Sequence, residues 1–293
     1  MKRDCDIYKG LLLGVLIGFI AFLLCPGVDG ENGRGPDGGS VAQRLVPGEK
    51  LHYKGYIFGF IPVGDVWMEV SEGTWEGRDV YRISARGYGS CPFYTLDISL
   101  TSYVDRATGL SLAYGDRQTG TEVRERALLF DRRKGMVAYR KRRGPYHTEK
   151  EMEAAPWYTR NETKVPEGTN DVLNSLYSAR SIGTKVGDKG SFWFIEKDWP
   201  WRVDVEVIGE REMRLKGLGT FDVLRIDIRP DYSSRPDKAA EFRGLFGVGG
   251  TLQVYIEKET KIPLMVTGRV PVAYIFRPTV TAVLKEMELP GDN

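Results

Sequence analysis

Cysteine and histidine are both scarce in this 293-residue chain, and their scarcity excludes several classes of protein. Of the three cysteines, Cys5 and Cys25 lie within the first 30 residues, which leaves Cys91 alone in the rest of the chain. A disulfide framework is therefore excluded, and the core must be held together by hydrophobic packing. Because the only histidines are His52 and His147, and no HExxH or CxxC motif occurs, we expect no metal site and no cofactor.

An excess of charge of one sign is also missing, since 42 basic residues stand against 40 acidic residues. This balance implies no strong attraction to nucleic acid, and we expect no nucleic-acid partner. The GxSxG motif of serine hydrolases is absent. Carboxylates are abundant but fall mostly at turns and on solvent-facing strand positions, so a two-carboxylate hydrolase ranks last among the functions considered. The sequence favours a non-catalytic protein, and we assign no catalytic residue.

Long hydrophobic runs are limited to the N-terminus, which excludes a membrane protein with several spans. Lys2, Arg3 and Lys9 flank the start of an apolar run over residues 10–25, the pattern of a signal peptide. The uncharged span reaches Val28, close to the roughly 20 residues that cross a bilayer, so an uncleaved anchor is the alternative. We expect residues 1–30 to be a signal peptide or a membrane anchor that contacts the membrane through residues 10–28. The protein would then lie in the periplasm, either released or anchored to the inner membrane.

The remaining chain reads as a flexible linker followed by a succession of strands and turns. Residues 31–44 are rich in glycine and polar residues, as linkers are. Residues 51–60 and 65–70 have strand patterns, and Pro62 in the segment 61–64 between them suits a turn or a strand edge. A convincing helical pattern occurs at Asp171–Arg180, which Asn170 or Asp171 can cap.

These patterns recur along the chain and decide the expected fold class. Strands alternate with turns, and no helical pattern sits between them, which argues against βαβ units. We expect a mainly β fold, an antiparallel sandwich or partly closed β-barrel with one packed α-helix, as a single domain over residues 45–289.

The segment Gly48-Glu49-Lys50-Leu51, with Tyr53 and Ile61-Pro62-Val63-Gly64, resembles the opening of a bacterial envelope family known as domain of unknown function 3108. The resemblance covers about residues 45–289 and implies an exported, mainly β protein, with no catalytic residues to transfer. One departure is Val254–Glu257, where the family often has a Trp followed by a polar pair. Further matches follow in the family's order: Tyr94 with Asp97, Ser102 with Asp105, Phe130-Asp131, Asp171, Leu173, Ser175, Leu176, Tyr177, Arg180, Gly187-Asp188, Gly219-Thr220-Phe221 and Ile262-Pro263.

A cluster of basic residues falls on one predicted hairpin. It suits contact with anionic lipid headgroups or nucleic acid. The favoured interpretation is a solvated hairpin, whose charges pair with Glu149, Glu151 and Glu153 on the following strand. The cluster consists of Arg132, Arg133, Lys134, Arg140, Lys141, Arg142 and Arg143.

The segment Lys197–Arg202 places Trp199 and Trp201 on either side of Pro200 in a predicted turn. Turns usually carry small polar residues, so two indoles at this point are unusual. We expect an exposed aromatic tip that contacts a membrane surface or an apolar ligand, with Lys197 and Arg202 adding attraction to headgroups. The alternative is that both indoles fold back onto the sheet.

Two non-catalytic functions fit these observations. The first is a binding module that holds a lipid or another apolar ligand, since a large curved sheet can enclose one. The second is a structural or interaction protein of the cell envelope with a fully packed core.

Overall fold

The computed structural model describes residues 45–91, 94–142, 144, 148–181, 183–195, 197–234, 249–269 and 278–291. The predicted leader and linker lie outside the described residues, as do Arg143 and His147. Within the described ranges, no helix is both long enough and apolar enough to cross a membrane.

Fifteen strands form one continuous sheet, in the order β8-β7-β6-β5-β4-β3-β2-β1-β15-β14-β13-β12-β11-β10-β9. Two α-helices and a short 3-10 helix, Tyr232–Ser234, accompany it: α2 (Glu149–Ala154) and α3 (Val172–Ala179). The strands are β1 (Lys50–Ile57), β2 (Ile61–Trp75), β3 (Arg78–Cys91), β4 (Tyr94–Asp105), β5 (Ser111–Gly120), β6 (Arg124–Asp131), β7 (Met136–Arg142), β8 (Trp157–Lys164), β9 (Asn170–Asp171), β10 (Lys189–Ile195), β11 (Pro200–Leu215), β12 (Gly219–Pro230), β13 (Gly249–Glu257), β14 (Pro263–Arg269) and β15 (Thr279–Glu288).

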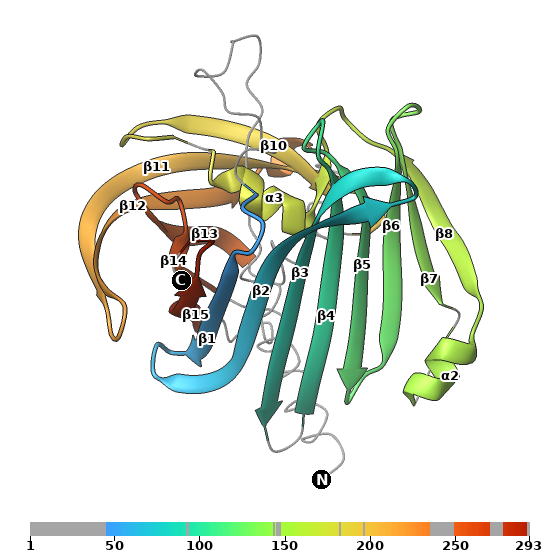
Figure 1. Ribbon diagram of the computed structural model, residues 1–293, viewed down its shortest axis with the longest axis horizontal. Helices are drawn as coiled ribbons and strands as arrows, with labels where there is room; N and C mark the ends of the chain where they lie inside the picture. The colour runs from blue at the N-terminus through green and yellow to red at the C-terminus, as the bar shows by residue number, and fades with distance from the viewer. Residues whose placement is uncertain are drawn as a thin grey trace.

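The connectivity is an up-and-down meander in which β1 pairs with both β2 and β15. All described strand pairs are antiparallel except β9 with β10. The sheet twists and curls, so that β10, β11 and β12 arch over one end of β3 to β7, and α3 lies beneath this arch (Figure 1). The prediction of a mainly β, antiparallel fold with a packed helix is confirmed, and it takes the form of one curled sheet rather than two stacked sheets.

Alternation along the strands separates an inner, buried face from an outer, solvated face. In β2, Val66, Met68 and Val70 are buried, whereas Trp67 and Glu69 are exposed, as a two-residue period requires. Inward side chains from strands across the whole sheet belong to one hydrophobic cluster. The curled sheet therefore buries its inner face against its own strands.

The first hairpin turns earlier than the sequence pattern predicted. Strand β1 ends at Ile57, the turn occupies residues 58–60, and Ile61–Gly64 already belongs to β2. Pro62 pairs with Tyr56 at a bulge, a position where a strand tolerates the missing N–H. Of the two positions expected for Pro62, the strand is the observed one, and the turn lies earlier, where Gly59, with a φ of 80°, supplies the left-handed residue that the turn needs.

Helix α3 matches the predicted helix closely and is anchored by buried polar groups. Asp171 is its N-cap, and the carboxylate accepts hydrogen bonds from the backbone N–H of Leu173 (2.8 Å) and Asn174 (3.1 Å). Ser102 of β4 donates a hydrogen bond of 2.6 Å to the same carboxylate. Burial raises the pKa of Asp171, and these hydrogen bonds oppose the shift in part. The network ties the start of α3 to the underlying sheet.

The other end of α3 is fixed by a buried ion pair. Arg180 donates to both carboxylate oxygens of Glu49, at 2.6 and 2.8 Å, and both side chains are almost fully buried. Burial alone would lower the pKa of Arg180, but the adjoining Glu49 carboxylate outweighs this and raises it. The guanidinium also lies over the ring of Tyr177, 4.3 Å from its centroid. These contacts join the residue before β1 to the C-cap of the helix.

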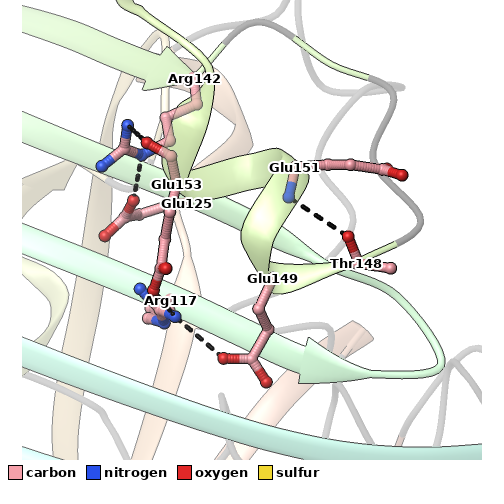
Figure 2. Close-up of polar contacts among 7 residues, drawn as sticks. All are labelled: Arg117, Glu125, Arg142, Thr148, Glu149, Glu151 and Glu153. Carbon is pink, nitrogen blue, oxygen red and sulfur yellow. Dashed lines mark hydrogen bonds and ion pairs between the residues drawn. The ribbon is translucent and has the colours of Figure 1, made fainter.

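Helix α2 replaces the strand on which Glu149, Glu151 and Glu153 were expected. Thr148 caps the helix by accepting a hydrogen bond from the N–H of Glu151, and Glu149 and Glu153 both pair with Arg117 of β5, at 2.9 and 2.6 Å (Figure 2). The expected placement on a strand is wrong. The Thr-x-x-Glu spacing at 148–151 is a helix-start signal that outweighs the strand pattern.

The basic hairpin is confirmed as β6 and β7, but most of its described cations are engaged. Arg132 donates to the carbonyl oxygens of Ser111 and Thr169, at 2.8 and 2.7 Å, and burial lowers its pKa to about 10. Arg142 pairs with Glu125, and donates to the carbonyl oxygens of Glu153 and Ala155 at the end of α2 (Figure 2). Arg140 and Lys141 lie over aromatic rings of β8. The cluster is therefore built into the sheet rather than displayed as a free basic patch.

The predicted aromatic tip at Trp199 and Trp201 is only partly present. Trp201 is 9% exposed, pairs with Phe194 in the sheet and belongs to the hydrophobic core. The expectation of an exposed indole is wrong for Trp201, because β11 begins at Pro200 and directs that side chain inward. Trp199 is half-buried in the turn, beside the exposed Lys197 and half-buried Arg202. Its contact with a membrane or a ligand stays a prediction.

We expect Trp201→Ser to destabilise the fold far more than Trp199→Ser. Removing a core indole costs about 3–5 kcal/mol, because the side chain leaves a cavity among packed residues. The free energy of unfolding from urea titration, measured for the two single variants, checks this. Equal losses for both variants would show that the two indoles have the same environment.

Gly64→Ala should destabilise the protein by about 1–3 kcal/mol, the usual cost of overpacking. A Cβ at this position would lie 2.5 Å from the carbonyl oxygen of Tyr88 and 3.1 Å from the Cα of Gly89, so backbone would have to move. Gly73→Ala in the same strand is the matched control, because a Cβ there meets nothing within 4 Å. Thermal unfolding of both variants is the measurement, and similar melting temperatures would contradict the proposed close approach.

Arg180→Met should cost about 3–5 kcal/mol, since it leaves the Glu49 carboxylate buried without its partner. Adding Glu49→Leu should restore part of the loss, so the double variant is more stable than the sum of the single variants predicts. Urea unfolding of the four proteins in this cycle measures the coupling. The exposed pair Lys50–Glu288, at 2.6 Å, is the control and should show little coupling. Additive losses at Glu49 and Arg180 would rule out a tight pair.

Candidate functional site

A shallow groove of about 340 Å³ lies on the outer face, over β15, β1, β2, β3 and β4. Its position follows from the register, which aligns outward residues of neighbouring strands. His52 pairs with Glu286 on one side and with Trp67 on the other, and Trp67 pairs with Arg86. The next row aligns Glu288, Lys50, Glu69, Ser84 and Thr101.

Small side chains create the hollow. Ser84 of β3 lies opposite Thr101 of β4, and Ser99 lies opposite Arg86. Long side chains stand around them, because Trp67, Arg82 and Arg86 project from the same face of β2 and β3. Leu51, Met68, Ala85 and Leu100 also line the groove, although their side chains are buried in the cluster on the inner face. The groove therefore has small hydroxyl side chains at its centre and an aromatic and charged rim.

Ion pairs fix most of the polar rim. Arg86 donates to both oxygens of Asp97, at 3.2 and 2.7 Å. Lys50 pairs with Glu288 at 2.6 Å. The two ring nitrogens of His52 face carboxylates, with Nε2 2.9 Å from Asp65 and Nδ1 3.4 Å from Glu286. These pairs hold the rim side chains in defined positions.

Trp67 and Arg82 are the two rim residues that offer the most to a ligand. The Trp67 indole is 43% exposed and stacks on the His52 ring, with 5.1 Å between centroids and 7° between planes. Stacking fixes the indole and leaves part of its surface open. Arg82 is exposed and makes no ion pair or hydrogen bond within the described residues. Trp67 lies opposite Arg86, and Arg82 lies opposite Ser71, so the aromatic surface and the cationic group line the same groove four residues apart along the strands.

The hydroxyl groups of the groove are not activated by its histidine. Among the described residues, Ser84, Ser99 and Thr101 make no hydrogen bond with His52, whose two ring nitrogens face carboxylates. In the described part of the chain, no group of three or more His, Cys, Asp or Glu residues is placed to hold a metal ion.

The predicted contact residues and the groove are separate. Lys197 and Trp199 lie in the turn between β10 and β11, Trp201 and Arg202 lie at the start of β11, and none of the four lines the groove. That turn meets β8 instead, where Thr163 donates a hydrogen bond of 2.6 Å to the carbonyl oxygen of Asp198.

Sequence reasoning missed the groove because it is assembled from five strands. One signal was present, since Trp67 is an aromatic residue on the polar face of an alternating strand. The small residues that open the space, Ser84, Ser99 and Thr101, acquire meaning only once their register with Trp67 is known.

Several solved structures share parts of this architecture at low similarity. A candidate lipoprotein from Parabacteroides distasonis is 10% identical, with 83% of this chain and 96% of that chain covered and a TM-score of 0.27. A candidate exported protein with a YmcC-like fold from Bacteroides fragilis is 8% identical, with 83% and 98% covered and a TM-score of 0.28. A candidate outer-membrane lipoprotein-sorting protein domain from Vibrio parahaemolyticus is 9% identical, with 86% and 90% covered and a TM-score of 0.21.

No curated protein sequence matches the chain. A family model does match, over residues 50–274, and its description is a protein of unknown function, DUF3108. The match spans all the strands that build the groove except β15. The chain therefore belongs to the DUF3108 family.

Proposed function

We propose that the protein is a non-catalytic binding module of the bacterial cell envelope, and that it holds an amphipathic ligand such as a lipid in the outer groove. The observation that carries the proposal is the presence of the exposed Trp67 indole and the exposed Arg82 guanidinium in the same groove, four residues apart along the paired strands. A ligand with an apolar body and an anionic head matches both parts. The volume of about 340 Å³ lies at the low end of the range for ligand pockets, about 300–1,000 Å³.

The proposed location in the cell envelope is supported by the N-terminal sequence. Basic residues followed by an apolar run are the pattern of an exported protein, and the family resemblance implies the same compartment. Whether the leader is removed or anchors the protein to the inner membrane makes no difference to the groove, because the described residues that line it begin at Lys50.

A structural or interaction protein of the envelope is the second candidate function. It is favoured by the inner face, whose side chains from strands across the sheet pack into one hydrophobic cluster. A ligand on the inner face would have to displace this packing. A protein of this second kind would use its surface to contact a partner and take up no lipid.

We expect residues 31–293 to bind oleate, an anionic amphiphile, and Trp67→Ala to weaken that binding by about tenfold or more, or about 1.4 kcal/mol. Arg82→Gln should weaken it less, because it removes a charge from an open site. Isothermal titration calorimetry gives the dissociation constants, and native mass spectrometry reports any lipid that copurifies.

Trp75→Ala is the matched control, since Trp75 stacks on Tyr103 of the same sheet face and does not line the groove. Its dissociation constant should equal that of the unaltered protein. Absence of copurifying lipid together with absence of oleate binding would favour the second candidate. Equal weakening by Trp75→Ala and Trp67→Ala would place the ligand elsewhere.

A further inference from the structure

The turn between β1 and β2 presents apolar side chains to solvent where hairpin turns normally carry polar ones. Phe60 is 72% exposed, Phe58 is 47% exposed and Ile61 is 43% exposed, and the exposed Pro62 follows them. Other described turns have the usual composition: Glu76-Gly77, Arg106-Ala107-Thr108-Gly109, Arg132-Arg133-Lys134-Gly135 and Lys216-Gly217. We define the hairpin tip as residues 57–62.

The hairpin tip is held in place rather than left loose. The N–H of Phe58 donates to the carbonyl oxygen of Thr279 at the start of β15, with a distance of 2.9 Å. Phe58 has a φ of 55°, a left-handed conformation that is unfavourable for a large side chain. The fold therefore maintains both an unfavourable backbone and exposed aromatic rings at one place. Neither feature contributes to packing of the core, which argues for a role in binding.

Charge indicates what the hairpin tip would bind. Lys54 and Asp65 pair across β1 and β2 with a distance of 2.7 Å, and no residue from Gly55 to Gly64 is charged. The uncharged end of the hairpin extends four residues beyond this ion pair, or about 13 Å at roughly 3.3 Å per residue. That length matches the depth of about 5–10 Å that interfacial segments reach in a bilayer. Insertion would bury no unpaired charge.

The shape of the hairpin and the length of the chain that precedes the fold both suit contact with a bilayer. The hairpin forms a narrow projection at the lower left of the sheet rather than a groove (Figure 1). A fluid lipid surface accepts a projection without needing a matching cavity. The 17 residues from Val28 to Leu45 can extend about 55–60 Å, more than twice the roughly 26 Å length of β1. An anchor at residues 10–28 would therefore allow the hairpin tip to reach the same bilayer.

We propose that the hairpin tip inserts Phe58, Phe60 and Ile61 into the interfacial region of a lipid bilayer and orients the sheet on the membrane surface. This contact is separate from the groove at Trp67, and one can exist without the other. Leader and hairpin tip together would give the protein two attachment points and fix which face of the sheet is turned toward the membrane.

The test uses the full chain in vesicles of phosphatidylethanolamine and phosphatidylglycerol, with Cys5, Cys25 and Cys91 replaced by serine. A nitroxide label is attached at Pro62→Cys, beside the hairpin tip, or at Thr74→Cys, an exposed position about 40 Å further along β2. Power saturation then compares collisions with oxygen, which enriches in lipid, and with a water-soluble nickel chelate. We expect oxygen to dominate at position 62 and the nickel chelate to dominate at position 74.

Adding Phe60→Ser and Ile61→Ser should shift the label at position 62 to the aqueous pattern, while Phe60→Leu should retain the lipid pattern. The spectrum of the label at position 74 reports whether each variant keeps its fold. An aqueous pattern at position 62 in the unaltered hairpin would overturn the proposal. Protection from both reagents, with or without lipid, would also overturn it, because this result indicates contact with a second protein copy.

Discussion

Burying one face of a single long sheet is the constraint on which this structure depends. A flat sheet of fifteen strands would leave both faces in water, and the described residues form no second sheet to cover either. The sheet therefore curls until its own strands cover the inner face, with α3 filling the arch between the two halves (Figure 1). The curl brings distant strands together, as the hydrogen bond between Thr163 of β8 and the carbonyl oxygen of Asp198 demonstrates. Side chains of the inner face then pack as one cluster.

Four of the residues on which the resemblance to DUF3108 rests serve this architecture. Glu49, Ser102, Asp171 and Arg180 are far apart in the sequence, yet all are buried around the two ends of α3. Buried charges are costly unless they are paired or hydrogen-bonded; here Glu49 and Arg180 pair with each other, and Asp171 accepts hydrogen bonds. In this chain these residues dock the helix onto the curled sheet.

Functional surfaces are left to the outer face and to the ends of hairpins. The outer face carries the groove, where Trp67 stacks on His52 and small residues leave room beside it. The turn between β1 and β2 carries exposed aromatic rings. Because the same two strands contribute to both, a ligand in the groove and a membrane at the hairpin tip would be held in a fixed relation to each other.

The sequence by itself determined the class of structure. Two-residue alternation, frequent turns and one capped helical pattern depend only on neighbouring residues, so the β fold and α3 were predicted correctly. Helix α2 was also encoded locally, by the Thr-x-x-Glu spacing at 148–151, although it was interpreted as a strand. Gly59 and the Pro62-Val63-Gly64 segment both carry turn signals, and the pairing of Ile61, Pro62 and Gly64 with β1 decides between them.

Only the tertiary structure decided which aromatic residues are buried and which are available. Trp201 and Trp67 both lie on alternating strands, but the first is buried and the second is exposed. The groove depends on the register of five strands, which brings Trp67 into line with the row that contains Ser99. Register and curl arise from contacts between residues hundreds of positions apart, such as His52 with Glu286. Local sequence patterns do not specify such pairings, because the alternation of one strand allows it to pair with many other strands.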